Sequence, residues 1–225
     1  MINTIMDNKH MSNLPNDNKP QTASKPNETS SVGVQGHIKI FDPDTKEVFI
    51  NKRNAIHYEN FSIALAQSIS NQGNGPIAEM VFGNGGSRVD PTGIITYLTP
   101  NTVGSNASLY NPTYYKTVDA RRISSLDPAR NFMEYRHIAG VPYSDILISC
   151  LLDFGEPSGQ DAFDNSTNQD GTYVFDELGL KSYSEAGPNL GSLLTHVIFH
   201  PVQKSLNRLI QIDYTIRIQS ISTGI

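Results

Sequence analysis

The chain has 225 residues, of which 37% are hydrophobic and 17% charged, and its formal net charge is −5 at pH 7. Wrapping a phosphate backbone requires clustered Lys and Arg, so this balance argues against direct nucleic-acid binding. Asn, Ser, Thr, Gln and Gly take the place of the missing charge, which suits both permanent assemblies and loop-rich β-proteins. The length favours one domain with a tail.

Residues 1–33 are rich in Asn, Lys, Pro, Ser and Thr, a composition that predicts a flexible polar N-terminal arm before a single domain at residues 34–225. The start lacks the apolar h-region of a secretory signal, and no run reaches the length of a membrane span. We therefore expect folding in a cytoplasm and no membrane partner. The arm is interpreted either as a tether to a neighbouring subunit or as a solvated tail, and its candidate anchors are Ile2, Ile5, Met6 and Leu14.

Two β-favouring runs, HIKIF and VFIN, flank the turn DPDTKE and predict a hairpin after Gly36. An amphipathic helix is expected next, with Asn54 as its N-cap. Its apolar stripe is predicted from the spacing of Tyr58, Phe61, Leu65 and Ile69, and we expect that stripe to pack on a sheet.

A glycine turn, GNGG, precedes a long stretch from Pro91 to about Thr113 that is rich in Thr, Asn, Pro and Tyr. Long ordered loops within compact domains commonly carry contacts, so we expect an interaction surface here, with an idle insertion as the alternative. Candidate exposed stacking residues in this region are Tyr97, Tyr110, Tyr114 and Tyr115.

The second half reads as strands: DILISCLLDF, TYVFDELGLKS, LLTHVIFHPV and RLIQIDYTIRIQS. In the last of these, apolar residues from Ile210 to Ile218 alternate with polar ones, which predicts a half-buried antiparallel strand. The fold class predicted is mainly β (α+β), an antiparallel β-sandwich with one main amphipathic helix and long loops.

Local motifs for catalysis or cofactor binding are incomplete in this chain. The GNGG turn lacks the Lys and Ser/Thr of a phosphate-binding loop, and we interpret it as a tight backbone turn. His196 and His200 lie on a β-like run without the Glu of a metalloprotease helix, and we expect both to be partly exposed. The segment DNSTNQDG departs from the EF-hand loop at Gln169.

Adjacent carboxylates at Asp176 and Glu177 are expected on opposite faces of a strand, where they form no catalytic dyad. Cys150 lies in an apolar run and is interpreted as a small buried hydrophobe. The sequence therefore predicts no catalytic, cofactor-binding or metal-ligating residues, no cofactor and no enzyme.

Five segments taken in order carry a resemblance: GHIKIFDPDTKEVFINKRNAIHYENFSIALAQSI, GNGG, SLYNPTYYKTVD, FDELGLKS and HPVQKSLNRLIQIDYTIRIQ. Together they cover most of residues 36–219, and this ordered set resembles virion structural proteins of contractile-tailed bacteriophages. Lys181 stands where the tail-fibre pattern has an aromatic residue, so a short adaptor or collar-type subunit fits better than a fibre.

The resemblance implies a non-enzymatic subunit of a tail, neck, collar or baseplate that binds other virion structural proteins, as a homo-oligomer. The expected location is the virion, assembled in the host cytoplasm. The alternatives are a capsid decoration protein and a carbohydrate- or receptor-binding module at a fibre attachment point.

Overall fold

The structure is a computed structural model that describes residues 29–119, 128–160, 162 and 172–223. Its strands and its helix are, in chain order, β1 (Thr29–Phe41), β2 (Val48–Ile56), α1 (Tyr58–Ile69), β3 (Ile77–Gly83), β4 (Ser87–Val89), β5 (Ile95–Tyr97), β6 (Pro112–Thr117), β7 (Phe132–His137), β8 (Tyr143–Leu152), β9 (Tyr173–Ser182), β10 (Leu193–Lys204) and β11 (Ile210–Thr223). β1 begins at Thr29, so residues 29–33 belong to a strand and not to the expected arm.

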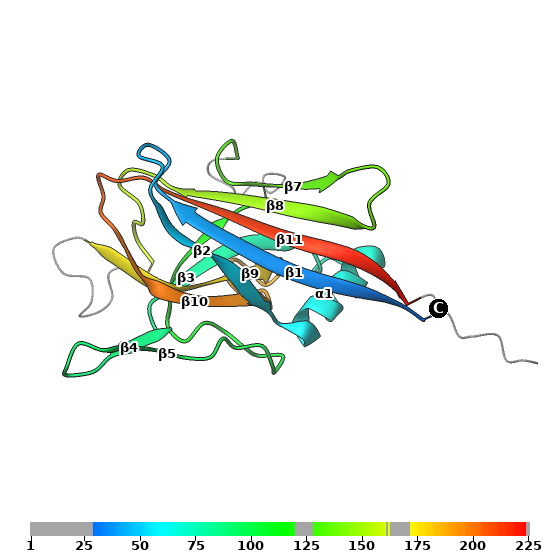
Figure 1. Cartoon of the computed structure of the whole chain (residues 1–225), viewed down its shortest axis with the longest axis horizontal. Helices are drawn as coiled ribbons and strands as arrows, with labels where there is room; N and C mark the ends of the chain where they lie inside the picture. Colours follow the sequence, from blue (N-terminus) through cyan, green and yellow to red (C-terminus); the bar gives the residue numbers. More distant parts are fainter. Residues whose placement is uncertain (1–28, 120–127, 161, 163–171, 224–225) are drawn as a thin grey trace, which may run out of the picture.

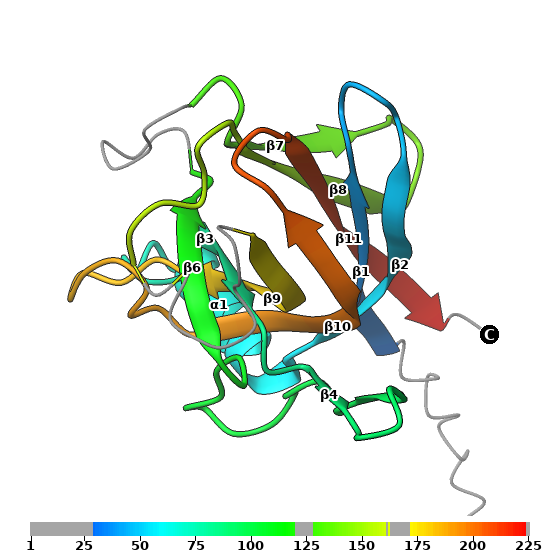
Figure 2. The same ribbon diagram turned by 90° about the vertical axis from the view of Figure 1, so that its left-hand side faces the viewer.

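Nine strands form one antiparallel sheet in the order β6-β3-β9-β10-β2-β1-β11-β8-β7, and β4 pairs with β5 in a small second sheet. β2 joins the two halves of the large sheet. It pairs with β1 as far as Asn54, and then with β10 through Ala55 and Ile56. The sheet curls at this junction, and Figure 2 shows β3, β9 and β10 on one side and β1, β11 and β8 on the other. The β-rich class is confirmed, whereas a sandwich of two separate sheets is not.

The main hydrophobic core lies between the two halves of the curled sheet. Ile38 and Ile40 of β1 share one buried cluster with Phe82 of β3 and with Leu178 and Leu180 of β9. Within the cluster, the rings of Phe82 and Phe175 meet edge to face with centroids 5.5 Å apart. Such packing needs both halves, so neither half buries its apolar face alone.

The alternation predicted for β11 is confirmed. Its apolar residues at 210, 212, 214 and 216 are fully buried. On the outer face, Arg217 makes a two-point ion pair with Asp145 of β8, with both N–O distances at 2.8 Å. The β1–β2 hairpin is also confirmed, and its turn is closed by the Asp42 carboxylate, which accepts from the backbone N–H groups of Asp44 and Thr45.

Helix α1 begins later than the sequence predicts, because β2 continues to Ile56 and His57 is the N-cap in place of Asn54. The buried residues of the helix are Asn60, Phe61 and Ala64. Tyr58 and Ile69, two members of the predicted stripe, are exposed. The stripe prediction is therefore wrong at both ends, since the helix packs through its middle only.

Replacing Ile38 with Ala should lower the free energy of unfolding by roughly 3 kcal/mol, because it leaves a cavity in the fully buried core. Chemical denaturation measures this loss. As a control, Val48→Ala at an exposed position of the neighbouring strand should change stability by less than about 0.5 kcal/mol. Equal effects at the two positions would contradict the assignment of the core.

Candidate interaction surface

The segment 84–111, here called the platform loop, contains β4, β5 and the connection that leads to β6. It lies beside β10, on the side away from the β1-β11-β8 half of the sheet, as Figures 1 and 2 both show. The loop includes most of the stretch that the sequence singled out as an interaction surface. Its position is fixed by polar contacts with residues of β9, β10 and α1.

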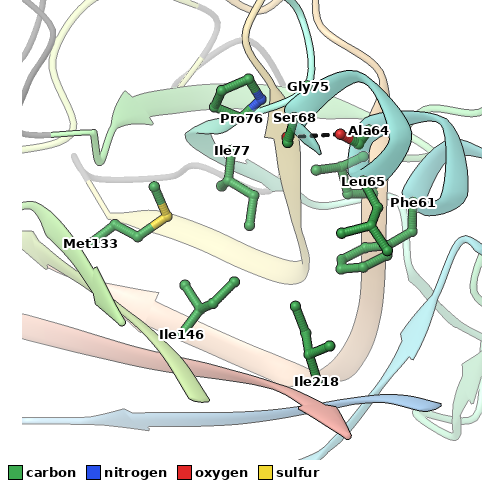
Figure 3. A pocket seen from close by; sticks show the side chains of 11 residues that line it. Phe61, Ala64, Leu65, Ser68, Gly75, Pro76, Ile77, Met133, Ile146 and Ile218 are labelled. Carbon is green, nitrogen blue, oxygen red and sulfur yellow. Dashed lines mark hydrogen bonds between the residues drawn. The ribbon is translucent and has the colours of Figure 1, made fainter. Parts of the chain in front are cut away.

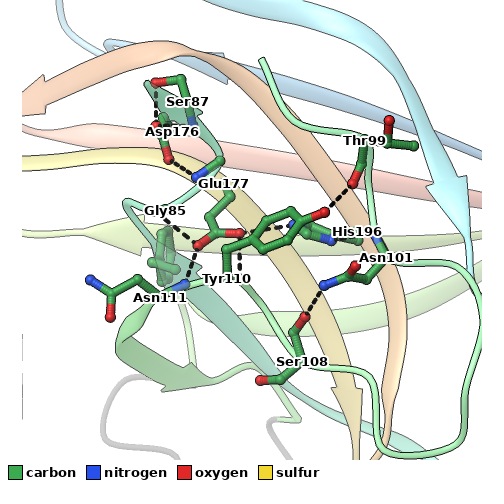
Figure 4. A network of polar contacts seen from close by, with 12 residues as sticks. Gly85, Ser87, Thr99, Asn101, Ser108, Tyr110, Asn111, Asp176, Glu177 and His196 are labelled. Atoms are coloured by element: carbon green, nitrogen blue, oxygen red, sulfur yellow. Dashed lines mark hydrogen bonds and ion pairs between the residues drawn. The ribbon is translucent and has the colours of Figure 1, made fainter. Parts of the chain in front are cut away.

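Glu177 of β9 makes the central contact. Its Oε1 accepts from the backbone N–H groups of Gly85, at 3.1 Å, and Asn111, at 2.8 Å. Its Oε2 accepts from the N–H of Tyr110, at 2.9 Å, and from Nε2 of His196, at 3.0 Å. Figure 4 shows these groups converging on one carboxylate. The two ends of the platform loop are thereby joined through a single fully buried side chain.

The hydrogen bonds of Glu177 decide its charge. Burial opposes ionisation, but the donors from His196 and from the backbone of Asn111, Tyr110 and Gly85 stabilise the anion and hold the pKa of the carboxyl below its usual value of 4.5. Glu177 is therefore a buried carboxylate anion at neutral pH.

His196 of β10 is held in one tautomer. Its Nδ1 accepts from the backbone N–H of Asn101 at 2.8 Å, so the ring proton resides on Nε2, which donates to Glu177. The Tyr110 ring lies beside the imidazole, with centroids 5.7 Å apart. His196 is fully buried, so the expectation of a partly exposed histidine is wrong there, whereas His200 is exposed.

Asp176 holds the first turn of the platform loop. Its Oδ1 accepts from the N–H of Gly86 at 2.9 Å, and its Oδ2 accepts from the N–H and hydroxyl of Ser87. Burial raises the pKa of the Asp176 carboxyl; the hydrogen bonds from Ser87 and Gly86 oppose that rise, and the charge of Glu177 adds to it. The folded protein thus disfavours the ionised form of Asp176, whereas it favours the ionised form of Glu177.

The two carboxylates lie on the same side of β9, contrary to expectation. Tyr173 and Phe175 face the core before them, and Leu178 and Leu180 face the core after them, so the alternation shifts by one residue at this point. β10 has an irregularity opposite this position, between Ile198 and Val202. Both acidic side chains therefore point to the outer face and bind the glycine turn.

The glycine turn packs against Glu177 and Asn111 and leaves no space for side chains. A Cβ on Gly83 would lie 2.5 Å from Oε1 of Glu177, and one on Gly85 would lie 2.8 Å from the backbone nitrogen of Asn111. The N–H groups of Gly85 and Gly86 donate to the protein's own carboxylates, which leaves them unavailable to a phosphate. The glycines are required here for close approach of the backbone.

Residues 104 and 105 of the platform loop are fixed to the start of α1. Nε2 of His57 is 3.0 Å from the carbonyl oxygen of Gly104, and the amide of Asn60 donates to the carbonyls of Ser105 and Leu193. Nδ1 of His57 accepts the N–H of Asn60 and caps the helix. One fully buried histidine therefore ends β2, starts α1 and holds the loop.

The outer surface of the platform loop carries large exposed apolar side chains, the most exposed of which is Val103 at 80%. Within the loop, the Tyr110 hydroxyl donates to the carbonyl of Thr99 at 2.7 Å and so connects two parts of the loop. The exposed members are Val89, Ile94, Tyr97, Val103 and Tyr110.

The predicted site residues are not brought together. Tyr97 and Tyr110 lie on the platform loop and are partly exposed. Tyr114 belongs to the main core, so the expectation that it is exposed is wrong, and Tyr115 is half-buried against a small cluster of Val81, Leu109 and Leu193. The expected anchors in the arm lie outside the described residues: Ile2, Ile5, Met6 and Leu14.

Within residues 29–119, 128–160, 162 and 172–223, no three His, Cys, Asp or Glu side chains gather as metal ligands. Segment 164–171, interpreted above as unlike an EF-hand, is outside these ranges. Cys150 is fully buried, and burial raises the pKa of its thiol to about 12, which opposes thiolate formation.

No helix in the described ranges has the length and apolar character needed to cross a membrane. No protein-family model matches the sequence, and comparisons with curated proteins and with solved structures found no match.

The lowered pKa of Glu177 gives a pH-dependent prediction. Glu177→Gln replaces a carboxylate oxygen, which accepts from N–H groups, with an amide group that donates toward them. The free energy of unfolding at pH 7 should fall by roughly 3 kcal/mol, a value that includes partial compensation from the loss of repulsion with Asp176. Because the folded pKa lies below the unfolded one, this loss should be full above pH 4.5 and shrink as the pH falls. Urea denaturation between pH 3 and pH 7 measures it.

Glu134→Gln is the matched control, since Glu134 is exposed on β7 and pairs with Arg136 at the surface. Its effect should be near zero at every pH. A Glu177→Gln loss that stays constant down to pH 3 would show that the ionised carboxylate is not what stabilises the fold.

Proposed function

We propose that the chain is a non-enzymatic structural subunit of a contractile-tailed bacteriophage virion, an adaptor in the tail, neck, collar or baseplate that binds neighbouring virion proteins. The observation that carries the proposal is the exposed apolar surface of the platform loop, presented on a backbone fixed by buried charge. The phage assignment itself comes from the ordered set of five sequence segments and their resemblance to virion structural proteins.

Fixing the loop favours a binding role. A loop that is ordered before it meets a partner loses less conformational entropy on association than a mobile one. Apolar side chains gain free energy when a partner removes them from water, and Val103, Ile94 and Val89 are each more than half exposed. Such a surface suits a permanent contact between subunits.

The buried network favours a structural role over a catalytic one. Both ring nitrogens of His196 form hydrogen bonds within the protein. Glu177 accepts four hydrogen bonds, one from His196 and three from backbone N–H groups. A general base needs a lone pair within reach of a substrate proton. These two groups, which resemble an acid–base pair in composition, instead hold the platform loop on the curled sheet.

A single charge on the platform loop tests the proposal. Val103→Asp should reduce incorporation of the protein into purified phage particles at least tenfold, because the charge cannot be desolvated at an apolar contact. Quantitative mass spectrometry of purified particles measures incorporation.

Val48→Asp, at an exposed position of the β1–β2 hairpin, is the control and should be incorporated normally. Absence of the wild-type protein from particles would refute the virion assignment. Normal incorporation of Val103→Asp would refute the role of the platform loop.

A groove beside the platform loop favours a second candidate, a carbohydrate-binding module at a fibre attachment point. It has a volume of about 400 Å³. The Tyr97 ring lines it, and the Tyr97 hydroxyl is 3.2 Å from Nδ1 of His200. An aromatic ring beside polar groups can stack on a sugar while those groups bind its hydroxyls. The remaining lining residues are Ile50, Lys52, Leu98, Pro100, Ile198 and Phe199.

Under this second candidate, a glycan array probed with the protein should show binding that Tyr97→Ala weakens at least tenfold. Tyr58→Ala removes an exposed tyrosine on α1, outside the groove, and should leave binding unchanged. Absence of binding at millimolar glycan would reject this candidate without affecting the first.

A further inference from the structure

A separate apolar pocket of about 190 Å³ lies between α1 and the inner face of the β7-β8-β11 half of the sheet. Figure 3 shows Met133, Ile146 and Ile218 on the sheet side, opposite Phe61 and Leu65 of the helix. The Ser68 hydroxyl, one of the few polar groups in the lining, donates to the carbonyl of Ala64 at 2.8 Å. The remaining lining residues are Gly75, Pro76, Ile77 and Leu194.

The apolar surface continues beyond the pocket along the sheet. Tyr135 of β7 pairs with Ile146, which places its ring on the same face, and it is 80% exposed. Val34 of β1 pairs with Ile218, and Val32, two residues earlier on that face, is 60% exposed. The pocket therefore adjoins exposed apolar side chains on one face of the sheet, which also carries the polar side chains of His137 and Ser144.

The size of the pocket points to a peptide side chain as its occupant. Pockets that enclose drug-sized ligands or cofactors have volumes of about 300 to 1,000 Å³. A volume of about 190 Å³ is smaller and suits one or two aliphatic side chains. The exposed Val32 and Tyr135 side chains add apolar contact area on the same face of the sheet.

The chain itself contains a segment of the required chemistry. All the large apolar residues before Thr29 lie in the first 14 positions. Residues 15–28 contain no large apolar side chain and can span at most roughly 50 Å when extended. This spacer ends at β1, the strand that carries Val32 and Val34.

The direction of β1 favours a neighbouring copy as the receptor. From Thr29 the strand runs inward, and its start lies at the outer end of the sheet, at the right of Figure 1. The spacer joins the domain at this outer end, so its reach of at most roughly 50 Å extends to a copy placed beside it.

We propose that the apolar residues at the start of the arm, Ile2, Ile5, Met6 and Leu14, dock into the α1 pocket of a second copy of the chain. This inference rests on the proposed function, and it adds that copies of the chain stand side by side in the particle. Each subunit then donates one arm and receives one. Burial of the Val32 and Tyr135 side chains would stabilise this exchange.

Disulfide trapping in the full chain tests the exchange. Met6→Cys combined with Met133→Cys places one thiol in the arm and one in the pocket, and Cys150 is too buried to compete. Under mild oxidation, this pair should form intermolecular disulfides, seen as covalent oligomers on non-reducing gels, in at least tenfold excess over the control pair Met6→Cys with Ile63→Cys. Ile63 is exposed on α1 but does not line the pocket.

Adding Leu65→Asp to the Met6→Cys and Met133→Cys pair should abolish the covalent oligomers, because a charge then faces the apolar lining. Equal yields for the Met133 and Ile63 pairs, or a disulfide formed within one chain, would overturn arm exchange. If particles contain the protein but the cross-link is absent, arm exchange fails and the proposed function stands. A specific cross-link in a protein that particles lack would instead overturn the proposed function and support the exchange.

Discussion

Four N–H groups from three separate stretches of the chain converge on the carboxylate of Glu177, and the arrangement of the outer surface depends on their staying there. A buried carboxylate without partners costs several kcal/mol, and buried backbone N–H groups without acceptors cost as much again. Glu177 therefore stabilises the platform loop only while the loop remains in place, and the dependence is mutual. Asp176 and His57 fix other parts of the loop in the same way, Asp176 at its first turn and His57 at Gly104.

The curled sheet gives this network its setting. The bend at β2 encloses the apolar core between two halves and leaves the outer faces of β9 and β10 free to carry polar groups. The same curl leaves the inner face open beside α1, where the helix covers only part of the sheet. One side of the body thus presents exposed apolar side chains on a fixed loop, and an apolar pocket lies beside α1.

Much of the secondary structure is predictable because it depends on local patterns. The alternation from Ile210 to Ile218 and the turn at Asp42 specify their strands and hairpin without reference to distant residues. The candidate site is not predictable in this way, because Glu177 meets partners 19 to 92 residues away and three of them are backbone N–H groups that no side chain marks. The available signal is that Glu177 and His196 interrupt apolar runs that are buried. The exposed Tyr58 and Ile69 show the converse: helical spacing identifies a face but not how much of it is covered.

Amide hydrogen exchange followed by NMR tests the role of Glu177 most directly. If the Glu177 network fixes the platform loop, the amides of Gly85, Tyr110 and Asn111 should exchange as slowly as those in the paired centre of β9, although they lie outside the large sheet. Exchange of these three amides at the rate of an open loop, with β9 still protected, would contradict that role.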